Sequence, residues 1–174
     1  MLLLFPVLML AQHPPDADVK KLYTAFHDID IDFLSERICS PYEGMELYAR
    51  LDAYFLNDSQ KFRYVFTNAK YNYGPVISVD GIDYHPVDFR NVIRITYFQP
   101  IDVASTQEQL KAKFAAQSIV YERARNSFLI VYQAKILTWN AQGIWKFAIL
   151  DQTIPKEITA GCLPESLKSR LGLQ

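Results

Sequence analysis

The residues that could carry chemistry are densest in a short acidic run, which is HDIDID at positions 27–32. Its alternating aspartates begin like a calcium-binding loop, which also needs glycine at its sixth position and glutamate at its twelfth. Phe33 and Cys39 occupy those positions, so the run fails as a calcium loop. We therefore expect a solvated helix face. The alternative is that Asp30 points into a pocket and acts as a general base.

His85 is the second candidate for a general base. It precedes Pro86 just after an expected hairpin, and no partner Ser, Cys or Asp can be identified for it. We therefore expect a loop histidine held by a local hydrogen bond. The signatures HExxH, GxSxG, GxxxxGK[ST] and GxGxxG are absent. The sequence thus favours a non-enzymatic protein without a cofactor or a metal site.

Aromatic residues indicate a place where a ligand could bind. Tyr84, Trp139 and Trp145 lie beside expected hairpins, and the two tryptophans could pair across the second hairpin. Such residues could line a pocket for a small apolar or sugar-like ligand. Ordinary packing in half-buried strands is the simpler explanation.

The overall charge argues against nucleic acid as a partner. The 174 residues include 18 Lys and Arg against 19 Asp and Glu, whereas nucleic-acid binders usually carry a basic excess. Several arginines fall in strand-rich regions, where they could hold an anionic ligand or simply occupy exposed strand positions. These arginines are Arg63, Arg90, Arg94, Arg123 and Arg125.

The two cysteines, Cys39 and Cys162, form no CxxC pair, so a zinc site is not expected. In an oxidising compartment they could form a disulfide. They could equally remain two separate buried thiols, which behave as small apolar residues. The sequence leaves both possibilities open, because it fixes neither the distance between the cysteines nor their direction.

The first eleven residues, MLLLFPVLMLA, are apolar and are followed by Gln12 and His13. That length suits the apolar region of a secretory signal and is too short for a bilayer span. We therefore expect a signal segment at 1–11, one domain at 12–174, and a periplasmic or secreted protein. A buried N-terminal strand is the alternative, although Pro6 disfavours a paired interior strand. No second apolar stretch is long enough to cross a membrane.

The elements begin with two helices. Apolar residues spaced by three and four predict one helix from about Asp16 to Cys39. Ser40, Pro41 and Glu43 predict a capped second helix that ends near Phe55. Its expected inward residues are Met45, Tyr48, Leu51, Tyr54 and Phe55.

Strands then alternate with shorter helices. Period-two patterns predict strands at 61–67, 76–84 and 92–98, with Asp80 and Gly81 at a hairpin turn. A helix capped at Ser105 follows, with Leu110 and Phe114 on its inner side. Strands at 118–123, 128–139 and 144–150 come next, the last two joined by a turn at 140–143. A short helix from Pro164 to Gly172 ends the chain.

This order predicts an α+β domain with an N-terminal helix pair, a curved and mostly antiparallel sheet of five to six strands, one inserted helix and a short C-terminal helix. Residues 22–30, LYTAFHDID, resemble the opening helix of the nuclear transport factor 2-like superfamily. Residues 143–147, GIWKF, resemble that superfamily's last strand. The resemblance implies a cone in which helices pack into a curved sheet, but no single function.

Three functions follow as expectations. The first is an exported, non-enzymatic protein that binds a small ligand or a protein partner in the cell envelope. The second is a small enzyme of the nuclear transport factor 2-like type that uses a pocket Asp or His as its base. The third is a structural component of the envelope. A homodimer is compatible with all three.

Overall fold

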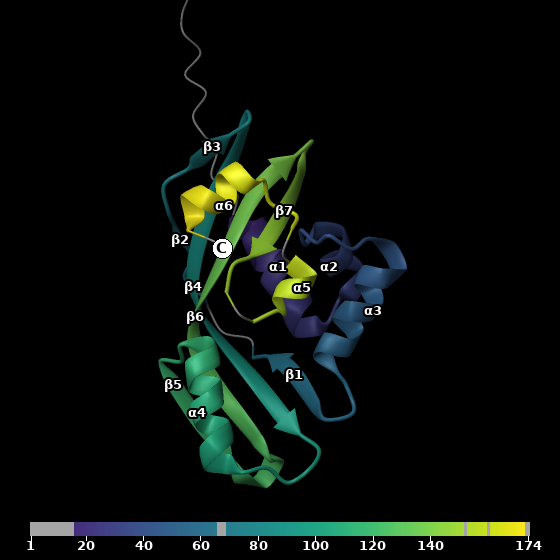
Figure 1. The fold of residues 1–174 in the computed structure, drawn as a ribbon, viewed down its shortest axis with the longest axis vertical. Helices are drawn as coiled ribbons and strands as arrows, with labels where there is room; N and C mark the ends of the chain where they lie inside the picture. Colours follow the sequence, from purple (N-terminus) through teal and green to yellow (C-terminus); the bar gives the residue numbers. More distant parts are fainter. Residues whose placement is uncertain (1–15, 66–68, 152, 160, 173–174) are drawn as a thin grey trace, which may run out of the picture.

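The protein was analysed as a computed structural model, which describes residues 16–65, 69–151, 153–159 and 161–172. Its described residues form an α+β fold, in which one antiparallel sheet is flanked by helices (Figure 1). The helices are α1 (Asp16–Asp28), α2 (Ile31–Arg37), α3 (Gly44–Phe55), α4 (Val103–Phe114), α5 (Lys156–Thr159) and α6 (Glu165–Leu171). The strands are β1 (Gln60–Tyr64), β2 (Asn72–Tyr73), β3 (Ile77–Val79), β4 (Ile82–Tyr97), β5 (Ser118–Glu122), β6 (Ser127–Ala141) and β7 (Ile144–Ile149).

Two long strands, β4 and β6, form the spine of the sheet. They pair in an antiparallel register that runs from Tyr84 opposite Trp139 to Thr96 opposite Ser127. β1 and β5 flank one half of this pair, while β2, β3 and β7 flank the other half. The predicted fold class is confirmed, with seven strands in the described residues.

The main hydrophobic core lies on the sheet face that carries the inward residues of β4 and β6. Val87, Phe89 and Ile93 from β4 meet Phe128 and Ile130 from β6 on this face. α1, α2, α3 and α4 contribute their apolar faces to the same core. Period-two alternation along the strands therefore separates this core face from an opposite, outer face.

A second, smaller hydrophobic cluster covers one end of the outer face. Tyr84 and Leu137 from the spine pack there with Leu163 and Leu167 from the C-terminal segment. α6 begins after Pro164, as predicted, and Gly172 ends it with a φ of 66°. A left-handed glycine at that position is a common helix stop.

The predicted first helix is wrong in one respect, because the structure divides it into α1 and α2. Ile29 adopts a φ of 59°, which breaks the right-handed helix. The Asp30 side chain then caps α2 by accepting a hydrogen bond of 3.0 Å from the Phe33 backbone N–H. An aspartate can offer the backbone such a local partner, and here a new helix starts there.

The predicted start of the second helix is also wrong. Gly44 has a φ of 55°, so a continuous right-handed helix cannot run through it from Pro41. Ser40 instead accepts a hydrogen bond of 3.2 Å from Tyr42 N–H, and Glu43 makes no side-chain cap. The inward face of α3 also differs from the predicted one. Leu47, Leu51 and Phe55 are buried, whereas Met45 and Tyr48, which were expected inside, are exposed.

The spine strand β4 is longer than predicted. The sequence predicted strands at 76–84 and 92–98, with His85 in a loop between them. In the structure Pro86 lies within β4, opposite Leu137, and its carbonyl accepts a hydrogen bond of 2.9 Å from Gly74 N–H. Val87 and Phe89 continue the alternation and face the core, so burial on one face outweighs the proline.

The predicted turns are confirmed where local chemistry defines them. Asp80 and Gly81 join β3 to β4 with φ values of 51° and 78°. The turn predicted at 140–143 is shorter in the structure, because Asn140 and Ala141 belong to β6, and Gln142 and Gly143 join β6 to β7 with φ values of 54° and 88°. Both pairs have the two positive φ angles that suit a two-residue hairpin. α4 is confirmed too, although Asp102 caps it by accepting from Ser105 N–H, rather than Ser105 acting as the cap.

Within the described ranges, none of the helices is both long and apolar enough to cross a bilayer. The expected signal segment at 1–11 lies outside the described residues.

Candidate functional site

A chain of polar groups lies inside the main core, between α1 and the sheet. Asn91 Nδ2 donates to the Tyr132 hydroxyl at 2.8 Å, and that hydroxyl lies 2.6 Å from Thr153 Oγ1. Thr153 in turn donates its hydroxyl and its backbone N–H to Asp151, which also accepts 3.0 Å from Lys135 N–H. The carboxylate thereby fastens the chain after β7 to the spine strand β6.

Burial controls the protonation of these groups. It raises the pKa of the Tyr132 phenol, and also those of Tyr54 and Tyr64 beside it, well above their ordinary range. Burial likewise raises the pKa of Asp151, against the effect of its hydrogen bonds from Thr153 and Lys135. The phenols are therefore neutral donors and acceptors at physiological pH.

The space beside this chain is small. Tyr64, Asn91, Tyr132 and Asp151 line a cavity of about 10 Å³, which α1 covers with Leu22 and Phe26. That volume holds about one water molecule. This cavity therefore offers hydrogen-bonded support and has no room for a substrate.

We expect substitution of Asp151 and of Glu122 to change the pH dependence of stability in opposite directions. Burial raises the pKa of Asp151 from its ordinary value of 3.8, so the folded state binds a proton more tightly than the unfolded state does. The unfolding free energy of wild type should therefore rise relative to that of Asp151→Asn as the pH falls, and this gain should be complete below pH 3.8. Hydrogen bonds from Arg94 lower the pKa of Glu122, so wild type should lose stability relative to Glu122→Gln as the pH falls through the lowered pKa.

Urea unfolding of wild type and both variants between about pH 7 and pH 3 measures the two differences. The Glu122→Gln variant serves as the matched control, since acid unfolding of the whole protein affects all three chains. Difference curves with the same slope for both variants would contradict the assigned pKa directions.

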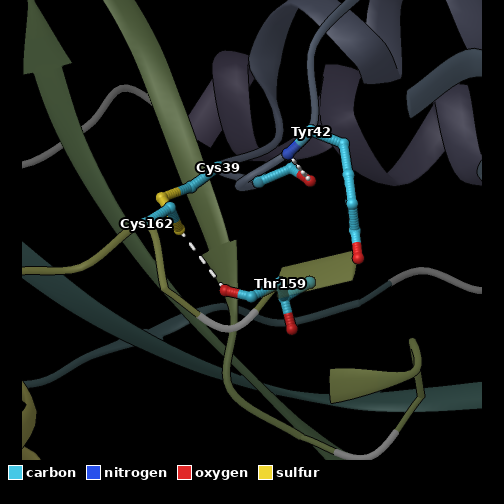
Figure 2. The surroundings of a disulfide bond; sticks show 5 residues. Cys39, Tyr42, Thr159 and Cys162 are labelled. Atoms are coloured by element: carbon cyan, nitrogen blue, oxygen red, sulfur yellow. Dashed lines mark hydrogen bonds between the residues drawn. A yellow bond between two sulfur atoms is a disulfide. The ribbon is translucent and has the colours of Figure 1, made fainter. Parts of the chain in front are cut away.

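A larger, open depression lies at the other side of the fold, next to a disulfide. Cys39 and Cys162 are bonded, with Cα atoms 5.7 Å apart, so the pairing that the sequence left open is present in the structure. Figure 2 shows the bond with Tyr42 in its surroundings, and a dashed line marks the contact from Cys162 Sγ to the Thr159 carbonyl oxygen, which is 3.4 Å long. We call the depression the disulfide groove. It measures about 740 Å³, and its side-chain walls include Arg37, Tyr42, Glu43, Trp139, Ile144 and Lys146.

Backbone and side-chain contacts fix both walls of the disulfide groove. On one wall, Ile38 bridges Phe147 in parallel, and Cys39 N–H donates to the Phe147 carbonyl at 2.7 Å. Lys146 Nζ spans the two walls by donating to the Glu36 carbonyl oxygen. Tyr42 is held by the Arg50 guanidinium, 3.7 Å above its ring. The groove is thus preformed, with aromatic, aliphatic and charged groups facing one space.

The predicted aromatic residues separate into two places. Tyr84 and Trp139 lie opposite one another in the β4–β6 register, with ring centroids 5.4 Å apart, and Trp139 reaches the disulfide groove. Trp145 pairs with Asn140 rather than with Trp139, and it packs against the main core. The two tryptophans therefore do not pair across the hairpin, because neighbouring register positions point to opposite faces.

The two predicted bases occupy different surroundings. Asp30 is exposed as the cap of α2, at the rim of a surface hollow of about 470 Å³ that Lys20 and Lys21 share. His85 is 3% exposed and lies within β4, not in a loop, with its ring centroid 5.8 Å from that of Trp145. The structure does not bring Asp30 and His85 together.

The sequence did not single out Asn91 and Asp151 as members of a site. Asn91 could have been noticed, because it occupies a core-facing position in a strand whose neighbouring core-facing residues are apolar. Asp151 could have been noticed from its spacing to Thr153, since an aspartate often bonds the backbone two residues on. The two residues are connected only because the segment that follows β7 lies against the sheet, and no local sequence pattern specifies that arrangement. No group of three or more potential metal ligands occurs among the described residues.

Comparison with known proteins finds no matching family model, no matching curated protein and no matching solved structure.

Proposed function

We propose that the protein is a binding protein of an oxidising compartment, which holds a small ligand or a segment of a protein partner in the disulfide groove. The observation that carries this proposal is the groove itself, where Tyr42, Trp139 and Ile144 converge beside charged groups. Its volume of about 740 Å³ is in the range of small-molecule sites.

The interior supports binding in the groove rather than chemistry in the core. The cavity beside Asp151 has room for about one water. Asp151 already accepts from Lys135 and Thr153, so its oxygens are engaged in holding the fold. Asp30 and His85 lie apart, and neither lines the groove.

The disulfide supports the proposed compartment. Disulfides persist in secreted and periplasmic proteins and are rare where thiol reductants dominate. The expected signal segment points the same way. Under this proposal the protein works in the periplasm or outside the cell, with its groove braced by the bond between Cys39 and Cys162.

The test is native mass spectrometry of the protein expressed in and purified from its own source. We expect an adduct that is lost on denaturation, and we expect Ile144→Asp to reduce the bound fraction at least about tenfold, since a carboxylate would be desolvated against the bound molecule. Ile82→Asp is the matched control. Each isoleucine follows the glycine of a two-residue hairpin, and the two are 46% and 39% exposed, but only Ile144 lines the groove.

Equal loss of the adduct in both variants, or its full retention in Ile144→Asp, would remove the groove as the binding site. A bare wild-type protein whose groove residues also fail to cross-link to any envelope protein, with a photoreactive group at position 144, would remove the proposed function.

A further inference from the structure

α3 carries an apolar stripe that faces away from the core. Met45, Tyr48, Ala49 and Ala53 recur at spacings of three and four, and Leu56 continues the stripe just after the helix. Met45 is 79% exposed and Leu56 is 51% exposed. Figure 1 shows α3 at the periphery, beyond α1 and α2. A second apolar stripe on one helix is typical of a helix that packs on both sides.

This stripe lies in an acidic part of the chain. Residues 16–55, which include α1, α2 and α3, carry nine Asp and Glu against four Lys and Arg. Asp52 lies within the stripe and Glu46 beside it, and Glu46 is paired with Arg50 at 2.9 Å. The charged residues at positions 43–61 are all exposed, and four of them are acidic (Glu43, Glu46, Asp52 and Asp58) against two basic ones (Arg50 and Lys61). The stripe therefore lies in a segment with a modest excess of negative charge, and Lys61 adjoins its end by bridging Leu56.

The outer face of the sheet has the opposite character. The register places Leu129 of β6 beside Val120 of β5 on the side away from the main core, with Val131 next to Leu129 on the same face of β6. These three side chains are at least partly exposed, whereas Val92 of β4, opposite Val131, is buried. Val120 is 53% exposed. Among the described residues of this face, five cations surround these side chains against two carboxylates. They are Lys61, Arg63, Arg90, Arg94 and Lys135 against Asp88 and Glu122.

Some of these cations are hydrogen-bonded to groups of the same molecule, and others are exposed and could contact a partner. Arg94 donates to Glu122 at 2.7 and 3.2 Å, and Arg63 donates to the Phe55 and Phe62 carbonyls. Lys61, Arg90 and Lys135 are exposed and surround the apolar centre. An apolar centre inside a charged rim is the usual anatomy of a protein interface, whereas phosphate-binding surfaces depend on cations alone.

We propose that copies of this chain associate head to tail, with the α3 stripe of one copy on the outer sheet face of the next. The two surfaces complement each other in charge and in their apolar centres, so each copy supplies the partner that its neighbour needs. Sheet-to-sheet pairing would oppose two basic rims, and α3-to-α3 pairing would oppose two acidic surfaces. A head-to-tail contact closes into a ring or continues as a filament, depending on the rotation between copies.

The experiment is sedimentation velocity on wild type and two blocked variants. Met45→Lys/Ala49→Lys replaces the stripe with cations that the basic face repels, at positions away from Lys61 of the sheet face, and Arg90→Glu/Lys135→Glu reverses the rim of the sheet face. All four side chains are exposed, and circular dichroism checks that both variants fold. We expect wild type to form species larger than dimers as its concentration rises, and each variant alone to associate at least about tenfold more weakly.

The decisive sample is the equimolar mixture of the two variants. Each retains one intact surface and can accept only one partner, so we expect a 1:1 dimer and no larger species. Raising the salt from about 0.1 M to about 1 M shortens the screening length from about 10 Å to about 3 Å and should weaken wild-type assembly. Ile82→Lys, which adds a cation outside both surfaces, should assemble like wild type.

A wild-type protein that stays monomeric at low salt up to its solubility limit would overturn the proposal. So would a blocked variant that assembles like wild type, or a mixture that forms no dimer. These readouts are independent of the disulfide groove, because none of the substituted residues lines it.

Discussion

A Cys39→Ala/Cys162→Ala variant is expected to lose about 4–5 kcal/mol of unfolding free energy, which is roughly 10–20 °C in melting temperature. The bonded cysteines are 123 residues apart, so the bond closes most of the chain into one loop. In the chain-entropy account, closing a loop this long removes many conformations from the unfolded ensemble. Urea unfolding of the oxidised wild type and of the variant measures the difference.

Reduced wild type supplies the control for this result. It keeps both sulfur atoms in the second hydrophobic cluster, where Cys39 and Cys162 pack with Leu163 and Leu167, but it lacks the covalent bond. Reduced wild type should therefore unfold close to the double-alanine variant. If reduction costs less than about 1 kcal/mol while the alanines cost much more, the cysteines stabilise by packing, and the loop-closure account fails.

Tyr132→Phe is expected to cost about 2–3 kcal/mol, although it removes one oxygen atom. The hydroxyl accepts from Asn91 Nδ2 and contacts Thr153 Oγ1, and both partners are buried. The substitution leaves the Asn91 amide without this acceptor, and an unsatisfied buried donor costs more than a hydrogen bond contributes. Tyr84→Phe is the control. It removes a hydroxyl from another buried tyrosine, outside this chain of bonds, and should cost less than about 0.5 kcal/mol.

A double-mutant cycle with Asn91→Ala isolates the pair. The two residues are neighbours on β4 and β6, facing each other in register, so we expect a coupling energy of about 1–2 kcal/mol. Additive costs would mean that the 2.8 Å contact contributes nothing specific, and that Tyr132→Phe acts through packing alone.

The parts of the fold that local chemistry defines were predictable from the sequence. The hairpin turns at Asp80 and Gly81, and at Gln142 and Gly143, both need positive φ angles, which the glycine in each pair adopts freely. The helix at 165–171 has Pro164 before it and Gly172 after it, and both signals act within one turn.

Errors arose where two local signals competed. The apolar stripe of the first helix continues across Ile29, so its period could not reveal the break that Asp30 stabilises by capping α2. The middle of β4 was predicted as a loop around His85, although Val87 and Phe89 continue the strand alternation past Pro86. At α3, the cap signal at Ser40 and Pro41 was strong, yet Gly44 sets the true start.

The candidate sites depend on contacts between distant segments, which explains why the sequence only hinted at them. Trp139 was recognised as a binding candidate from its type, but the disulfide groove exists only because residues 35–44 lie along β7. Asn91 and Asp151 belong to one hydrogen-bonded chain because the segment after β7 lies beside β6, next to the cavity that α1 covers. Sequence spacing carries no information about either arrangement.

The long spine also gives the molecule a mechanical property. β4 and β6 share thirteen register pairs, and a 16-residue strand extends at most about 50 Å. The bonds between antiparallel strands run perpendicular to the strand axis, so a pull along that axis loads many of them together in shear instead of opening them one by one. The described sheet is therefore stiff along its spine, and a pull along that axis should meet more resistance than a pull that peels β4 from β6 at one end.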